Sequence, residues 1–185
     1  FPAIRTCITD QKRGPLEVGQ ADDIACRSVE MFEAFGFAEK VLKEAYWVNE
    51  TAFWRPDPKD PTRIARSGRI EDTEEGLSEF PHVILNQARV HDFFLEVMRN
   101  APTRLAPHYS RRLVSLKIAK GAALPVTATF EHTETGAQEV IRARYVVGAD
   151  GARSTVRREI GRSLEGAAAN QAWGVMDVLC TTDFP

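Results

Sequence analysis

The residues best suited to binding chemistry gather around a glycine-rich turn near the end of the chain. The apolar run Tyr145-Val146-Val147 leads into Gly148-Ala149-Asp150-Gly151, and Ser154 then opens a short predicted helix that ends before Gly161. Glycines let the backbone approach a ligand closely, and a helix N-terminus presents N–H groups to an anion. The pattern predicts a site for anionic and hydroxyl groups at the end of a strand, or a tight strand–turn–helix connection without a ligand.

Asp10 is a second candidate because it directly follows residues 3–9, whose β-branched side chains predict a strand. An acid at the end of such a strand holds ribose hydroxyls in nucleotide-binding βαβ units. The accompanying G-x-G-x-x-G motif would lie roughly 20 residues upstream, before Phe1. We therefore expect a piece of a longer protein, with a short natural chain with trimmed termini as the alternative.

Four further polar residues precede or begin predicted helices. Asp22 and Asp23 come before a helix that starts with Arg27. We expect Asp23 to cap this helix and interact with its dipole, whereas Asp22 is either a cap or a functional carboxylate. His82, in an apolar stretch, is either a satisfied core histidine or a catalytic group. Gln87, at the start of another helix, either contacts a ligand or caps the helix.

Composition excludes several classes of protein. The 185 residues include 24 Lys+Arg and 26 Asp+Glu, which give a net charge of −2 and argue against nucleic-acid binding. No apolar run reaches the roughly 18 residues that a membrane-spanning helix needs. Three scattered cysteines, in no metal-binding spacing with the histidines, predict free thiols, a reducing cytoplasmic location and no metal site.

The elements that must position these residues alternate between helices and strands. The apolar period predicts a helix over 88–100, with Asn86 as its N-cap, and shorter helices over 27–35 and 38–45. A polar stretch over 71–79 predicts a loop. Residue composition predicts further strands over 46–55, 63–70, 111–118, 125–132, 138–147 and 173–179. Together these elements predict an α/β domain interrupted by β-rich insertions.

The run Tyr145 to Arg157 resembles the Asp-Gly motif of the class A flavoprotein monooxygenases, which share the fold of para-hydroxybenzoate hydroxylase. Gly19-Gln20-Ala21-Asp22, followed by Arg27-Ser28-Val29-Glu30, is similar to the phenol hydroxylase branch of that family. Residues 80–91 and 170–177 are similar to the 3-hydroxybenzoate 4-hydroxylases within it. The family's G-x-G-x-x-G and later Gly-Asp motifs do not occur here, so the resemblance implies an internal fragment.

The resemblance also implies roles for individual residues. Asp22 matches a carboxylate that contacts the phenolic hydroxyl of the substrate, and His82 matches a histidine near that pocket. The positions that match cofactor contacts are Asp10 at the ribose, Gln20, Arg27 and Gln87 toward FAD, and Asp150 with Gly151 toward FAD and NADPH.

The implied fold is α/β, an incomplete Rossmann-like FAD-binding domain with β-rich insertions of a substrate domain. Residues 1–46 and 83–165 are assigned to the FAD-binding domain, 47–82 to an insertion near the substrate pocket, and 166–185 to the start of the substrate domain.

The implied activity is hydroxylation of a phenolic aromatic acid, with 3-hydroxybenzoate giving 3,4-dihydroxybenzoate. It uses NADPH, O2 and a flavin C4a-hydroperoxide in a homodimeric parent. The alternatives are a phenol 2-monooxygenase of the same family or a catalytically inactive binding fragment, and we expect the 185 residues alone to be inactive.

Overall fold

The computed structural model describes residues 3–167, 169–172, 174, 176 and 178–184. Three helices, α1 (Cys26–Ala34), α2 (Ala38–Glu44) and α3 (Gln87–Asn100), confirm the helices predicted from the sequence. Between α1 and α2, Gly36 adopts a φ of +79°, a conformation that favours glycine. At the start of α3, the Asn86 side chain accepts a hydrogen bond from the Ala88 N–H at 2.9 Å, as predicted for an N-cap.

The core lies where these three helices meet. Phe37 stacks on Phe32 and meets Phe94 edge to face, both with ring centroids 4.9 Å apart. Buried aliphatic side chains from α1, α2 and a neighbouring strand complete the cluster, and the fully buried ones are Val29, Val41 and Val83. The helical period of apolar residues in the sequence thus gives each helix an apolar face, and these faces are buried against one another.

A small antiparallel sheet underlies the helices. Its strands are β1 (Asp23–Ile24), β5 (His82–Ile84) and β2 (Tyr46–Val48), in the order β1-β5-β2. The central strand pairs Val83 with Ile24 on one side and with Trp47 on the other. This sheet therefore brings together three segments that are far apart in the sequence.

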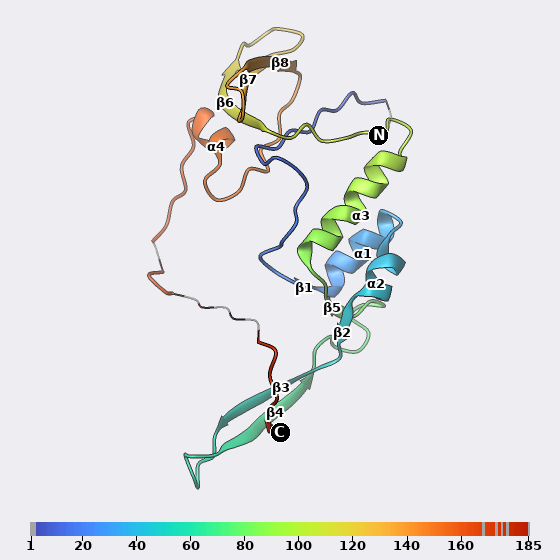
Figure 1. Cartoon of the computed structure of the whole chain (residues 1–185), viewed down its shortest axis with the longest axis vertical. Coiled ribbons are helices and arrows are strands. Elements are labelled where there is room, and N and C mark those ends of the chain that lie inside the picture. Colours follow the sequence, from blue (N-terminus) through green and yellow to red (C-terminus); the bar gives the residue numbers. More distant parts are fainter. Residues whose placement is uncertain (1–2, 168, 173, 175, 177, 185) are drawn as a thin grey trace.

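A long hairpin extends away from this sheet (Figure 1). Its strands, β3 (Glu50–Pro56) and β4 (Ile64–Glu71), pair from Glu50 opposite Glu71 to Pro56 opposite Ile64. The strand predicted over 46–55 is therefore two strands, because the chain leaves the small sheet after β2 and enters the hairpin at β3. The predicted loop over 71–79 is confirmed beyond the end of β4.

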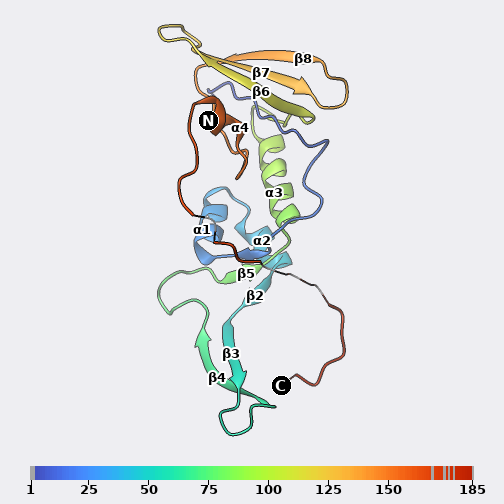
Figure 2. The same ribbon diagram turned by 90° about the vertical axis from the view of Figure 1, so that its left-hand side faces the viewer.

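The third sheet is an antiparallel meander of β6 (Arg111–Ile118), β7 (Val126–His132) and β8 (Gln138–Ala143). The short helix α4 (Thr155–Glu159) lies beside it (Figure 2). One link between them is the Leu116 N–H, which donates to Glu159 Oε2 at 3.2 Å. No helix within the described ranges has the length and apolar character needed to cross a membrane.

The strand predicted over 3–9 is wrong and the strand predicted over 138–147 is too long, because the residues concerned lack a pairing partner. Residues 3–9 form no strand, and only Thr9 makes an isolated parallel bridge, with His108. The strand predicted to reach residue 147 ends at Ala143, and Tyr145 and Val147 are 81% and 89% exposed. Among the described residues no strand pairs with either segment, so the backbone has no ladder to join. The strand predicted over 173–179 includes residues 173, 175 and 177, which lie outside those the structure describes.

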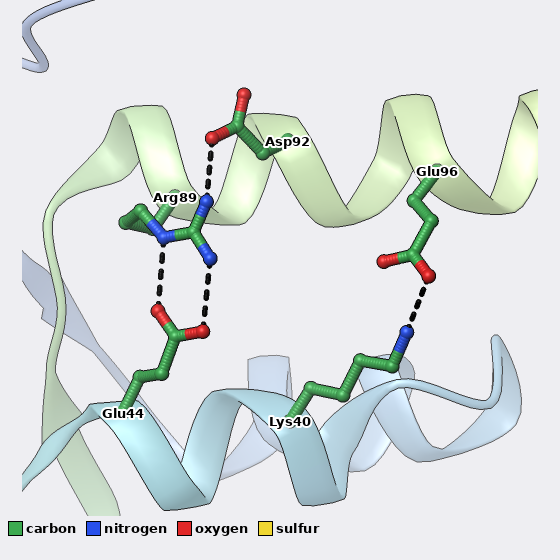
Figure 3. A network of polar contacts seen from close by, with 5 residues as sticks. All are labelled: Lys40, Glu44, Arg89, Asp92 and Glu96. Carbon is green, nitrogen blue, oxygen red and sulfur yellow. Dashed lines mark hydrogen bonds and ion pairs between the residues drawn. The ribbon is translucent and has the colours of Figure 1, made fainter.

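Charged side chains join α2 to α3 across their exposed sides (Figure 3). Arg89 donates from Nε and Nη2 to the two carboxylate oxygens of Glu44, at 2.9 and 2.8 Å, and from Nη1 to Asp92 at 2.7 Å. Lys40 and Glu96 form a second link between the helices at 2.6 Å. The two carboxylates raise the pKa of the Arg89 guanidinium, with the hydrogen bond to Glu44 as the largest cause.

Candidate functional site

Two of the predicted cofactor residues are brought into contact at the start of α3. The Gln20 N–H donates to the side-chain Oε1 of Gln87 at 3.1 Å. Gly19 allows this contact, because a Cβ at that position would lie 2.3 Å from the Cβ of Gln87. The side chain of Gln87 therefore holds the loop of Gly19 and Gln20 against α3. The side chain of Gln20 itself is exposed.

The two adjacent carboxylates take different positions. Asp23 lies in β1, and the N-cap of α1 is Ala25, which makes no side-chain cap bond. The prediction that Asp23 caps the helix is therefore wrong, because pairing of β1 with β5 places Asp23 two residues before the cap. Asp22 is exposed, and its backbone carbonyl accepts a hydrogen bond from the Leu85 N–H at 2.9 Å.

His82, at the start of β5, lies among carboxylates. Its Nδ1 lies 2.7 Å from Asp72 Oδ2, and its Nε2 lies 3.8 Å from Asp23 Oδ1. No hydrogen bond or ion pair joins His82 to Asp22 within the part of the chain that the structure describes. The ladder explains this arrangement, because Asp23 pairs with Ile84 and alternate residues of β5 share a face.

Asp72 is a member of this site that sequence reasoning missed. It follows β4 directly, in the segment assigned only as a polar loop, and its side chain is 18% exposed. Its neighbours in sequence carry no apolar periodicity, so no local signal distinguishes it from the other acids of the loop. Only the pairing of β3 with β4 and of β2 with β5 brings it beside His82.

The Asp150 turn is organised by its own side chains. Asp150 accepts hydrogen bonds from the Ser154 hydroxyl and, at 3.0 Å, from the Val156 N–H, while Ser154 Oγ accepts from the Arg157 N–H at 3.0 Å. The predicted Ser154 cap is confirmed, but the N–H groups of Val156 and Arg157 are not free for an anion. Desolvation acts to raise the pKa of the Asp150 carboxyl, but the hydrogen bonds from Ser154 and the backbone outweigh it and lower that pKa.

Gly151 gives this turn its shape, with a φ of +75° and no heavy atom within 4 Å of an added Cβ. The turn is exposed, so both oxygens of Asp150 keep lone pairs that a further donor can reach. A hydroxyl-rich ligand is the kind of partner that suits them.

Asp10 lies at the start of the β6–β8 unit. Its backbone N–H donates to the His108 carbonyl at 3.0 Å, and its carbonyl accepts from the Arg111 N–H at 2.8 Å. Its carboxylate accepts from the Lys12 N–H at 2.8 Å, which closes a tight turn. Burial first, and the charge of Asp10 second, raise the pKa of the neighbouring Tyr109.

The free donors of this region suit a ligand with phosphate and hydroxyl groups. Arg27, in the first turn of α1, is exposed and makes no ion pair or side-chain hydrogen bond to any described residue. The Gln20 amide is likewise without a side-chain bond among those residues. Arg27, Gln20, Asp10 and Asp150 are each exposed; the guanidinium and the amide can donate hydrogen bonds, and the two carboxylates can accept them.

Solved structures share this arrangement of helices and sheets. The p-nitrophenol 4-monooxygenase from Pseudomonas putida superposes with a TM-score of 0.72 at 19% identity, over 89% of this chain and 39% of that one. The architecture is therefore the α/β fold of the flavin monooxygenases, with β-rich insertions. A family model for an FAD binding domain matches residues 3–185, and the chain belongs to that family.

Curated relatives are similar over nearly the whole chain. The 3-hydroxybenzoate 4-monooxygenase of Comamonas testosteroni is 66% identical over 100% of this chain. A phenol 2-monooxygenase of Aspergillus fumigatus is 34% identical over 98% of it. The chain spans 30% of the length of the first relative and 29% of the second.

Proposed function

We propose that this chain is part of an FAD-dependent, NADPH-using monooxygenase that hydroxylates a phenolic aromatic acid, converting 3-hydroxybenzoate to 3,4-dihydroxybenzoate. The observation that carries the proposal is the 66% identity to a 3-hydroxybenzoate 4-monooxygenase across the full length of the chain. When bound, FAD reduced by NADPH supplies the activation of O2 that hydroxylation requires.

In this proposal the FAD-facing residues hold the cofactor by complementary charge and hydrogen bonding. The Arg27 guanidinium and the Gln20 and Gln87 segment meet the phosphates and flavin, and the Asp10 carboxylate meets the ribose hydroxyls. The turn of Asp150 and Gly151 serves FAD and NADPH together. The exposed side chains of Arg27, Gln20, Asp10 and Asp150 support these roles, since each can form a hydrogen bond with a ligand.

The proposed catalytic residues act on the substrate. A free phenol has a pKa of about 10, so the site must help to withdraw its proton before the ring reacts. Asp22, exposed beside the end of β5, accepts a hydrogen bond from the phenolic hydroxyl and favours the phenolate. His82 orients the ring from the neighbouring strand, and residues 47–82 form an insertion near the substrate pocket.

The test is Asp22→Ala in the full-length parent, with Glu33→Ala on the exposed side of α1 as the matched carboxylate control. We expect Asp22→Ala to lower product formation about 100-fold or more, since general-base groups contribute on this scale. Bound FAD, measured by absorbance, should be unchanged in both variants. Equal turnover of Asp22→Ala and Glu33→Ala would show that Asp22 is only a structural residue.

The second candidate is a phenol 2-monooxygenase, favoured by the 34% identity to a relative of that name. The two activities are separated by comparing phenol with 3-hydroxybenzoate as stimulants of NADPH oxidation by the parent. A parent that binds no flavin would instead favour a non-catalytic binding module. We propose that the 185 residues alone turn over no substrate.

The parent's surroundings and assembly are also proposals. Cys7, Cys26 and Cys180 are free, which supports a reducing, cytoplasmic location. The homodimer is proposed from the family resemblance, and sedimentation of the purified parent measures it.

A further inference from the structure

His82 is held on one side of its ring by a half-buried carboxylate. Its Nδ1 lies 2.7 Å from Asp72 Oδ2, and the two side chains are 23% and 18% exposed. An ionised carboxylate has no proton to donate, so the proton in this hydrogen bond belongs to the histidine. The contact therefore selects the tautomer of the neutral ring that carries hydrogen on Nδ1.

Asp72 is itself oriented by the base of the hairpin. Its other oxygen, Oδ1, accepts from the Thr51 hydroxyl at 3.2 Å, and its backbone N–H donates to the Asn49 carbonyl at 3.1 Å. Both carboxylate oxygens are thus used, one toward β3 and one toward β5. Figure 1 shows that the hairpin leaves the small sheet in this region, where β2 meets β3.

The opposite ring nitrogen of His82 is left available. Its nearest carboxylate oxygen belongs to Asp23, at 3.8 Å, which is too long for a hydrogen bond. The Asp23 side chain is 79% exposed, so solvent screens its charge. With hydrogen fixed on Nδ1, the Nε2 lone pair can accept a hydrogen bond from a ligand.

We propose that Asp72, oriented by Thr51, is a positioning residue that fixes the tautomer and orientation of His82 and presents Nε2 to the polar substituent of the aromatic substrate. The inference rests on the proposed function, because it places the substrate at the Nε2 edge of the imidazole ring, away from Asp72. Asp72 touches no substrate in this proposal, and its effect passes entirely through His82. Carboxylates that orient metal-binding histidines affect activity about 10- to 100-fold, and we expect an effect of the same order for Asp72 on His82.

The experiment uses the full-length parent with FAD bound. The variants are Asp72→Asn, His82→Asn and the double variant, with Glu71→Gln as a control, since Glu71 is the exposed carboxylate next to Asp72 and makes no side-chain bond to a described residue. One readout is kcat and KM for 3-hydroxybenzoate. The other is the tautomer of His82 in the resting enzyme, from NMR of protein labelled with ¹⁵N-histidine, with His82→Asn identifying the signal.

We expect the wild type and Glu71→Gln to show hydrogen on Nδ1, and Asp72→Asn to lose this preference. Asp72→Asn should lower kcat/KM about 10-fold or more, yet change it less than about 2-fold when His82 is already Asn, as expected for coupled residues. Thr51→Val should shift the tautomer of His82 in the same direction, with a smaller loss of kcat/KM. If Asp72→Asn does not fold, Thr51→Val serves as the test of the role of Asp72.

An unchanged tautomer in Asp72→Asn and Thr51→Val would overturn the inference, as would losses in Asp72→Asn and His82→Asn that simply add. A parent that hydroxylates no phenolic acid would refute the proposed function instead, while the NMR measurement on the resting enzyme would still decide the role of Asp72.

Discussion

Gly19 leaves no room for even the smallest side chain. A methyl group there would lie 2.3 Å from the Cβ of Gln87 and 3.1 Å from its backbone nitrogen. We expect Gly19→Ala to push the loop away from α3, break the Gln20 to Gln87 hydrogen bond and cost about 1–3 kcal/mol of stability.

Urea unfolding of the parent, together with its flavin content, measures the effect of Gly19→Ala. Gly14→Ala is the matched control, because no heavy atom lies within 4 Å of a Cβ at Gly14. Equal stability and equal flavin content in the two variants would show that the loop yields without cost.

Asp150 gives the turn before α4 a dependence on acid. Because its folded-state pKa lies below the ordinary value of 3.8, its carboxylate stabilises the fold above that value. This contribution is lost as the pH falls through the lower folded-state pKa, where the carboxyl becomes protonated in both states. We expect Asp150→Asn to be less stable than the wild type near neutral pH, with a difference that shrinks below about pH 4.

Acid titrations of both proteins, followed by circular dichroism and urea unfolding, give this difference. Ser154→Ala removes the hydroxyl that donates to Asp150 and should weaken the same acid dependence. A difference in stability between the wild type and Asp150→Asn that does not change with pH would contradict a lowered folded-state pKa of Asp150.

Much of the candidate site could be read from residue types. Gln87 at a helix start and Ser154 as a cap follow from local pattern, and the structure places both as predicted. Asp72 could not be found in this way, because its role depends on strand pairing between segments remote in sequence. The supposed cap at Asp23 failed for the same reason, since pairing with β5 outweighed its local tendency to cap.

At the scale of elements, α2 and α3 are joined by charges as well as by the aromatic core. We expect Arg89→Ala to cost about 1 kcal/mol at low salt, because three partly exposed hydrogen bonds to Glu44 and Asp92 are lost. The guanidinium also lies 5.1 Å from the centroid of the Phe93 ring, so some packing is lost with the charge.

Urea unfolding of Arg89→Ala at low and high salt separates these contributions, since salt screens the ion pairs and leaves packing unchanged. Lys43→Ala is the control, because its ion pair with Glu39 lies within α2 and joins no second helix. A loss of stability that does not respond to salt would assign the effect of Arg89 to packing alone.

The helices were predictable, whereas one strand and the end of another were not, for a physical reason. An α-helix satisfies its own backbone, so the apolar period over 88–100 was sufficient to locate α3. A strand needs a neighbour, and residues 3–9 and 145–147 have strand-like composition without a described pairing partner. The strands predicted over 111–118 and 125–132 were confirmed, because they pair with each other and lie close together in the sequence.

At the scale of the whole molecule, the chain is open. Its accessible surface is 15226 Å², whereas a compact monomer of this mass exposes about 8,900 Å². Large apolar side chains, among them Tyr145, Val147 and Leu179, are exposed. We expect the 185 residues expressed alone to bind an apolar dye such as anilinonaphthalene sulfonate, because exposed apolar side chains attract such ligands.

Dye fluorescence of the isolated chain, compared at equal molarity with that of the full-length parent, tests this expectation. The parent should bind much less dye per molecule if further chain covers these residues. Equal fluorescence from the two proteins would show that the apolar surface is exposed in both.

The parallel bridge between Thr9 and His108 has a consequence for the timing of synthesis. Roughly 100 residues must be translated after Thr9 before its partner exists, which takes roughly 5–20 s at ordinary rates of elongation. The sheet of β1, β5 and β2 also waits, because its central strand is made last of the three. Until β5 and α3 are made, only Phe37 and α2 can pack against the apolar side of α1, so we expect this side to stay partly exposed on the nascent chain.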